Sequence, residues 1–337
     1  MPGSQSVQFE TKINIASPTA WRILVRSEIC SGRSGSTEIA AAEHVRCILS
    51  YCRKTTACFY TTMRVTIFGA SGLLGKYLLR EWKHDDVTGL SSRDVDIRDL
   101  QQVQRIVENY RPEWIVLAAA YTDVDGCETN PDLAFQTNCA GAVNVATVAF
   151  EHGSRLLFLS TDYVFDGTKP TPYEINDPRN PKTVYGRSKA EAEIAITKIL
   201  PASCIVRTSW VFGTGGKCFA DTILKLAAIR PEIDVVDDQR GCPTYARDLS
   251  RAIIELCRRD ASGTVHATNV GDCTWFQFAS EIIRVSGLET VVRPTTSDKF
   301  PRPAQRPKYS VLSPKSLLPY YPHMPTWQEA LQVYLSE

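Results

Sequence analysis

The chain has 337 residues, enough for one large domain with appendages, and its 38 lysines and arginines almost balance 37 aspartates and glutamates. That balance argues against a general nucleic-acid binder, and the 43% hydrophobic content argues against a mostly disordered chain. Apolar runs stay shorter than the roughly 18 residues that span a bilayer, so we expect no membrane helix and no membrane partner.

The eleven cysteines indicate the redox compartment. No two form a C-x-x-C pair, which makes a zinc ribbon unlikely on spacing grounds, and no secretory signal opens the chain. We therefore expect reduced thiols and a cytoplasmic protein.

The chain changes character at Met63. Residues 1–62 show no sustained hydrophobic period, whereas a β-branched, strand-like run begins at Met63. We interpret Met63 as the true or ancestral start and residues 1–62 as an extension that is poorly ordered or not native. The rival is a targeting segment, which the four glutamates among residues 1–62 disfavour, because transit peptides are poor in acids.

From Met63 onward, strand-like and helix-like stretches alternate. The expected strands are 64–68, 86–90, 114–118, 155–160, 204–207 and 233–236. The expected helices are 73–82, 99–110, 132–151, 185–199 and 219–230. Six strands joined by helical crossovers predict an α/β fold with a doubly wound parallel sheet of the Rossmann type.

A glycine loop follows the first expected strand. Gly69, Gly72 and Gly75 stand where the strand turns into a helix. The first permits a tight turn, the second lets the backbone approach a pyrophosphate, and the third lets the helix pack on the strand. The helix amides then face the phosphates, so we expect a bound dinucleotide.

The end of the second expected strand bears on the choice of cofactor. Ser91, Ser92 and Arg93 stand where an acid would bind the ribose 2′-hydroxyl of NAD. Two hydroxyls and a guanidinium suit a phosphate, so we expect NADPH. Asp94 keeps NADH as the alternative, and Arg93 could equally be a solvated loop charge.

The alternation of strands and helices loosens after Gly213, and prolines multiply. We expect residues 63–212 to form the NAD(P)-binding Rossmann domain. Residues 213–337 would be mainly a substrate-binding portion, with some segments returning to the sheet. Thr274 is the expected N-cap of a late helix.

Three residues form a candidate catalytic set. Tyr185 and Lys189 lie one helical turn apart, so the ammonium should lower the pKa of the phenol and hold the nicotinamide ribose. Thr161 ends the fourth expected strand, where its hydroxyl can bind a substrate carbonyl. A Y-x-x-x-K pair alone is common, but the threonine and the glycine loop make this set resemble that of the short-chain dehydrogenase/reductase superfamily.

Longer blocks carry a closer resemblance. They are Ala118–Asp125, Ser160–Gly167, Arg207–Gly213, Asp238–Thr244 and Ala304–Ser310, together with Trp327. Over residues 63–337 the chain resembles the dTDP-4-dehydrorhamnose reductase family. The resemblance implies reduction of the C4 ketone of dTDP-4-dehydro-β-L-rhamnose to dTDP-L-rhamnose, the last step of dTDP-rhamnose biosynthesis, by NADPH or NADH.

The resemblance also implies roles for individual residues. Tyr185 would protonate the new alkoxide, Lys189 would tune Tyr185 and Thr161 would orient the carbonyl. The implied cofactor contacts are Gly72, Leu73, Leu74, Asp96, Ile97, Ala120, Tyr121 and Thr122. The implied substrate contacts are Asp162, Tyr163, Trp210 and Gln239, although Trp210 could instead be plain core packing.

Two departures accompany the resemblance. Cys218 stands where family members often carry an asparagine, which puts one substrate contact in doubt. Some members bind Mg²⁺ at a subunit interface, but no ligands can be assigned in this chain. A homodimer remains open.

Three alternatives stay open. A 4,6-dehydratase would need a glutamate after the Thr161-Asp162 pair, and Tyr163 stands there instead. A non-catalytic NADP-binding subunit, similar to the regulatory β subunit of methionine adenosyltransferase, shares the fold and much of the block around Tyr163. The third alternative is another nucleotide-sugar reductase.

Overall fold

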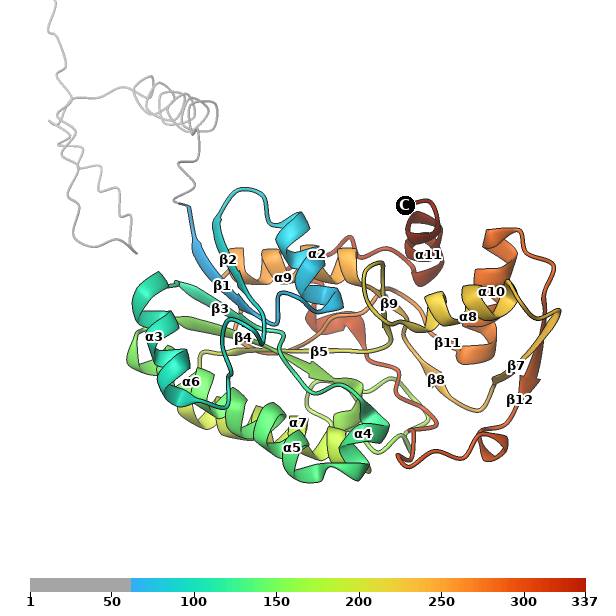
Figure 1. Cartoon of the computed structure of the whole chain (residues 1–337), viewed down its shortest axis with the longest axis horizontal. Coiled ribbons are helices and arrows are strands. Elements are labelled where there is room, and N and C mark those ends of the chain that lie inside the picture. Colours follow the sequence, from blue (N-terminus) through green and yellow to red (C-terminus); the bar gives the residue numbers. More distant parts are fainter. Residues whose placement is uncertain (1–61) are drawn as a thin grey trace, which may run out of the picture. The chain divides into compact units, whose positions relative to one another are not determined.

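The structure is a computed structural model, and it describes residues 62–337 (Figure 1). These residues belong to one compact unit. Our prediction for the extension of residues 1–62 lies, except for Thr62, outside the described residues.

A six-stranded parallel sheet forms the centre of this unit, in the order β10-β5-β4-β3-β1-β2. It confirms the predicted doubly wound α/β fold. In chain order the strands are β1 (Arg64–Phe68), β2 (Asp86–Leu90), β3 (Trp114–Leu117), β4 (Arg155–Thr161), β5 (Cys204–Thr208) and β10 (Gly263–His266).

Helices cover both faces of the sheet, above and below it in the view of Figure 1. One face packs against α2 (Leu73–Glu81) and α9 (Ala246–Arg258). The other packs against α3 (Leu100–Tyr110), α6 (Gly141–Glu151) and α7 (Val184–Ile199). Because both faces are buried, the central strands are continuous apolar runs, such as the fully buried β3.

The predicted helix over 132–151 is three consecutive pieces. They are α5 (Pro131–Phe135), a π-helical turn η1 (Gln136–Ala140) and α6. A short helix α4 (Val124–Thr129), which we did not predict, precedes them. The π-helical turn is a local change in hydrogen bonding that hydrophobic periodicity does not reveal.

The sixth strand of the sheet is not the predicted segment 233–236, and this prediction was wrong. That segment is β7 (Glu232–Val236), which pairs in parallel with β12 (Val291–Thr295) in a separate two-stranded sheet. β10 instead pairs with β5. Its sequence, Gly-Thr-Val-His, has one strongly apolar residue and therefore carries no strand signal.

The remaining elements form a second layer around their own apolar cluster, on the right in Figure 1. Its helices are α8 (Phe219–Ala227), α10 (Trp275–Ser286) and α11 (Trp327–Leu335). Short pairs join β6 (Val211–Phe212) to β9 (Thr244–Tyr245), and β8 (Arg240–Gly241) to β11 (Cys273–Thr274). The predicted cap is confirmed, because the Thr274 hydroxyl accepts from the Gln277 amide at the start of α10.

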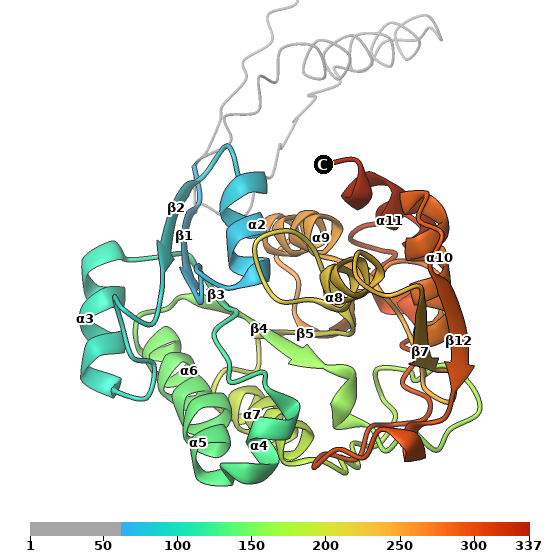
Figure 2. The same ribbon diagram turned by 45° about the vertical axis from the view of Figure 1, so that its right-hand side comes forward.

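The order of the sheet places a ligand site. From β1 the chain moves outward to β2, then crosses back to β3 and continues toward β10 (Figure 2). Ligands of such sheets bind at this reversal, beyond the carboxyl ends of β1 and β3. Within residues 62–337, no helix combines the length and the apolar content needed to cross a membrane.

Candidate active site

Two cavities meet at the reversal point of the sheet. The β2 cavity, about 410 Å³, lies at the end of β2, and the β4 cavity, about 430 Å³, lies at the end of β4. Gly69, Gly72, Ala118 and Ala120 line both of them. The two cavities are therefore parts of one crevice, which is joined at the glycine loop.

The backbone of the glycine loop requires its glycines. Gly69 has φ +93°, and a Cβ on it would lie 2.5 Å from the Ala119 amide nitrogen. A Cβ on Gly75 would collide with the Gly69 carbonyl oxygen. Gly72 caps α2 without a side-chain hydrogen bond, so the first amides of this helix can bind an anion. These features fit the predicted pyrophosphate, with Leu73 and Leu74 beside it in the β4 cavity.

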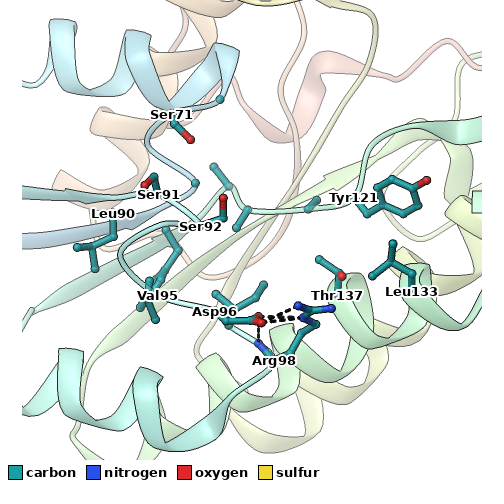
Figure 3. Close-up of a pocket in the computed structure, with 17 residues that line it drawn as sticks. Ser71, Leu90, Ser91, Ser92, Val95, Asp96, Arg98, Tyr121, Leu133 and Thr137 are labelled. Carbon is teal, nitrogen blue, oxygen red and sulfur yellow. Dashed lines mark hydrogen bonds and ion pairs between the residues drawn. The ribbon is translucent and has the colours of Figure 1, made fainter. Parts of the chain in front are cut away.

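The β2 cavity gathers residues predicted for the adenosine half of the cofactor and for its middle. Ser91, Asp96, Ile97, Ala120 and Tyr121 line it. Figure 3 shows Ser91 and Ser92 on one side of this cavity, with the paired Asp96 and Arg98 on another. Predicted Thr122 lines the β4 cavity instead.

Arginine positions in the β2 cavity differ from our expectation. Arg93, predicted to bind a phosphate, is exposed and does not line the cavity, whereas Arg98 does. The Arg98 Nη2 lies 2.7 Å from Asp96 Oδ2, and its Nε lies 2.9 Å from Asp96 Oδ1. The sequence offered no signal for Arg98, because it is one of several charged residues in a loop.

Asn138, which was not predicted from the sequence, hydrogen-bonds to Tyr121 of the β2 cavity and to Ser188, the neighbour of Lys189. Its Oδ1 accepts from the Tyr121 amide at 2.7 Å, and its Nδ2 donates to the Tyr121 carbonyl at 3.0 Å. The same Nδ2 donates to Ser188 Oγ at 3.1 Å, next to Lys189 on α7. Asn138 lies in the π-helical turn, so this local irregularity orients an amide that fixes the loop after β3.

The β4 cavity brings the predicted catalytic residues together. Thr161, Tyr185 and Lys189 all line it, as do the predicted substrate residues Asp162 and Tyr163. Thr161 ends β4, and Tyr185 and Lys189 lie one turn apart on α7. The Lys189 ammonium lies 3.9 Å from the centre of the Phe158 ring, a cation–π contact inside the protein.

The protonation of this set differs from our expectation. Burial raises the pKa of Tyr185, and the charge of Asp162 adds to the rise, while the neighbouring Thr161 hydroxyl lowers it. Burial also lowers the pKa of Lys189 to about 7, although the charge of Glu193 opposes this. The pKa of Tyr185 therefore lies above its usual value, opposite to the lowering expected from Lys189, because burial is the largest influence on both groups.

Glu193 extends the catalytic face of α7 by one more turn. Its carboxylate is fully buried and accepts from Ser160 Oγ at 2.5 Å, from Arg207 Nη2 at 2.7 Å and from Arg179 Nε at 2.6 Å. Burial alone would raise the pKa of Glu193, but Arg207, Ser160 and Arg179 together outweigh it and hold that pKa below its usual value. The spacing of Tyr185, Lys189 and Glu193 was the signal that could have identified it.

Asp162 is a buried carboxyl beside the phenols. Its Oδ1 accepts from the Thr161 hydroxyl at 2.9 Å, and burial raises its pKa to about 6. The ring of the neighbouring Tyr163 meets that of Tyr185 edge-on, with 5.8 Å between centroids. The end of β4 and the start of α7 thus place polar groups of several kinds around a single cavity. They are the hydroxyls of Ser160 and Thr161, the carboxyl of Asp162 and the phenols of Tyr163 and Tyr185.

Trp210 lines the β4 cavity and is also packed. It has φ +47°, which is strained for a bulky residue, and it stacks on Trp275 with 3.4 Å between ring centroids. A Cβ on Gly241 would lie 2.6 Å from its Cε2. The predicted sugar contact Gln239 does not line this cavity, and the sequence analysis missed Trp275.

Cysteines and metal ligands contribute little to this site. Cys218 caps α8, where its Sγ accepts from the Asp221 amide at 3.5 Å and packs as a small buried residue. The cysteines within residues 62–337 are free thiols. No three His, Cys, Asp or Glu side chains of that range gather as a metal site.

Comparisons with known proteins agree with this geometry. Residues 63–337 match the model of the family described as the RmlD substrate binding domain. Spore coat polysaccharide biosynthesis protein SpsK of Bacillus subtilis is 40% identical over 276 residues, or 81% of this chain and 97% of that protein. The dTDP-4-dehydrorhamnose reductase of Mycobacterium tuberculosis is 40% identical over 259 residues, or 74% and 84%. A solved dTDP-4-dehydrorhamnose reductase of Bacillus anthracis in complex with NADP has a TM-score of 0.80 and 38% identity, over 82% of this chain and 99% of that one.

Proposed function

The chain belongs to the dTDP-4-dehydrorhamnose reductase family, as its motifs predicted, and on that premise we propose that it reduces the C4 ketone of dTDP-4-dehydro-β-L-rhamnose to a hydroxyl. The product is dTDP-L-rhamnose, and the reaction is the last step of its biosynthesis. The observation that carries this proposal is the β4 cavity, where Thr161, Tyr185 and Lys189 surround one space that opens onto the glycine loop.

The crevice fits an extended dinucleotide. The amides at the start of α2 bind the pyrophosphate, which the glycine loop can approach closely because it carries no side chain at Gly69 and Gly72. Ser91, Asp96 and Ile97 hold the adenosine half, and Tyr121 and Thr122 flank the middle. Bound NADPH or NADH supplies the hydride that C4 of the sugar accepts. We expect both to serve, with NADPH preferred.

The side chains of the β4 cavity supply the proton and orient the ketone. When the ketone binds, the Thr161 hydroxyl turns from Asp162 and donates to the ketone oxygen, and Tyr185 transfers its phenolic proton to that oxygen as the C–H bond forms. Burial keeps the phenol protonated before reaction, which is the state that a proton donor needs. Lys189 stabilises the phenolate that results and holds the ribose hydroxyls.

The sugar nucleotide enters from the side of the second layer. Asp162, Tyr163 and Trp210 line the β4 cavity, whereas Gln239 does not. We place the reaction in the cytoplasm, which the free thiols of residues 62–337 support. A homodimer remains part of the proposal on family resemblance alone.

Oxidation of NADPH with dTDP-4-dehydrorhamnose as substrate tests the function. Wild type should turn over, and Tyr185→Phe should lose about a thousandfold in kcat, because the proton donor is gone. Tyr110→Phe, on the exposed surface of α3, is the matched control and should behave as wild type. An inactive wild type that still binds NADPH would favour the non-catalytic binding subunit. Turnover surviving Tyr185→Phe would instead refute this proton donor.

A further inference from the structure

The loop after β2 carries an anion that the proposed mechanism does not use. Asp94 Oδ2 accepts from the Ser91 amide at 2.7 Å and from the Ser91 hydroxyl at 2.6 Å. The Arg93 amide in turn donates to that hydroxyl at 3.2 Å. Both donors of Ser91 are therefore engaged by Asp94 within the chain itself.

Ser91 stands where the two cofactors differ. It lines the β2 cavity at the carboxyl end of β2, the place where the adenosine ribose of a dinucleotide lies on such a sheet. An acid at this place favours the free 2′-hydroxyl of NADH and repels the 2′-phosphate of NADPH. Asp94 lies just outside the cavity lining, and its hydrogen bonds from Ser91 hold its pKa below the usual value, so it is anionic at neutral pH.

The charge of Arg93 acts on Asp94, but both groups are exposed to water, so Arg93 offsets the Asp94 charge only in part. Arg98 forms its two-pronged pair with Asp96 on another side of the cavity (Figure 3). Arg93 is exposed and does not line the cavity. A 2′-phosphate placed beside Ser91 would therefore find both Ser91 donors already hydrogen-bonded to Asp94. It would also lie close to the negative charge of that carboxylate.

We propose that Asp94 is a specificity-determining residue, which holds the Ser91 donors that a 2′-phosphate needs and so keeps NADH competitive with NADPH. This rests on the proposed function only in assuming that the chain binds nicotinamide dinucleotides. The phosphate of NADPH binds by taking the Ser91 donors from Asp94, against the repulsion of its charge. Asp94→Ala removes both obstacles, whereas Asp94→Asn removes the charge but leaves an amide oxygen that can still accept from Ser91.

Direct titration of NADPH and NADH, followed by quenching of protein fluorescence, tests this. Asp94→Asn should tighten NADPH about tenfold and leave NADH within about twofold, because one nearby charge is removed. Asp94→Ala should shift the ratio of the two Kd values in the same direction. Glu108→Gln is the matched control, since it removes one exposed carboxylate from α3 and should leave both Kd values unchanged.

Thermal denaturation establishes that each variant is folded. A ratio of Kd values that stays at the wild-type value in both Asp94 variants would overturn the proposal, as would equal changes for both cofactors. Because the titration needs no turnover, a protein that fails to reduce the keto sugar yet shows the shifted ratio would refute only the proposed function. Failure to bind either dinucleotide would refute both.

Discussion

The two cavities of the crevice are built from different kinds of structure. The β4 cavity takes its catalytic lysine and the supporting carboxylate from a regular element, where Lys189 is 2% exposed and Glu193 is 0% exposed, although Lys217 of an exposed loop also lines it. The β2 cavity takes its charged groups from the loop after β2, where the paired Arg98 and Asp96 side chains are 43% and 37% exposed. Water screens the second set and hardly reaches the first.

This difference indicates which substitutions should affect stability and which should affect only ligand binding. Groups buried in the β4 cavity interact with the fold and with the reaction at once, so removing one should alter stability and chemistry together. Groups around the β2 cavity should alter which ligand binds, with little effect on the fold. Four substitutions test this contrast, in order of decreasing expected effect.

Glu193→Ala should produce the largest change in stability. It leaves the Arg207 guanidinium buried without its carboxylate, and we expect the free energy of unfolding in urea to fall by about 3–5 kcal/mol. Glu191→Ala, which removes an exposed carboxylate from the same helix, should change it by less than about 0.5 kcal/mol. Equal effects would break the contrast between buried and exposed charges.

Lys189→Met should raise stability while abolishing reduction. The native pKa of about 7 lies below the ordinary 10.5, so the charged form costs the native state free energy. We expect a gain of about 2–4 kcal/mol at pH 7 and below. Since the unfolded lysine keeps its proton up to about pH 10.5, wild-type stability recovers as pH rises from 7, and the gain shrinks.

Urea unfolding of Lys189→Met and wild type at pH 6 and pH 9 measures this gain. Lys198→Met, an exposed position on the same helix, serves as the control and should show no such pH dependence. A Lys189→Met variant less stable than wild type at pH 6 would contradict the burial of an ammonium.

Trp275→Ala should have an intermediate effect. Without the stacked ring, Trp210 is free to leave its strained backbone conformation, and we expect KM for the sugar nucleotide to rise about three- to tenfold. Trp275→Phe keeps an aromatic face and should restore most of the affinity. A KM that does not respond to Trp275→Ala would place Trp210 in the core rather than at the substrate.

Arg98→Ala should have the smallest effect on stability. Its ion pair with Asp96 is exposed, so we expect the free energy of unfolding to change by less than about 1 kcal/mol. Cofactor affinity, measured by titration, should change by only a few-fold. A larger loss of stability would show that the β2 cavity is not the adaptable end of the crevice.

Local patterns predicted the parts of the molecule that depend on neighbours in the chain. The glycine loop, the Tyr185–Lys189 turn and the capping residue Thr274 each act within one or two turns of backbone, and all lie where the sequence placed them. The strands β1, β3, β4 and β5 were found because both faces of a central parallel strand are buried and their sequences are apolar, whereas β2 lies at the edge of the sheet and has one buried residue.

Other features depend on partners far away in the chain. β10 is a strand because β5 offers it an edge, not because its own residues favour one. Glu193 can be buried only because Arg207 and Arg179 converge on it from other elements. Asn138 is aimed by a π-helical turn that no periodicity predicts.

The late arrival of β10 also bears on the synthesis of the protein. β5 is complete once residue 208 has left the ribosome, but its outer edge stays unpaired until residues 263–266 follow. During that interval the nascent sheet exposes backbone amides and carbonyls that another chain could pair with. A fragment ending at residue 212 would carry this open edge permanently and should aggregate. The edge of β5 is therefore paired only after the ribosome has synthesised the chain up to β10.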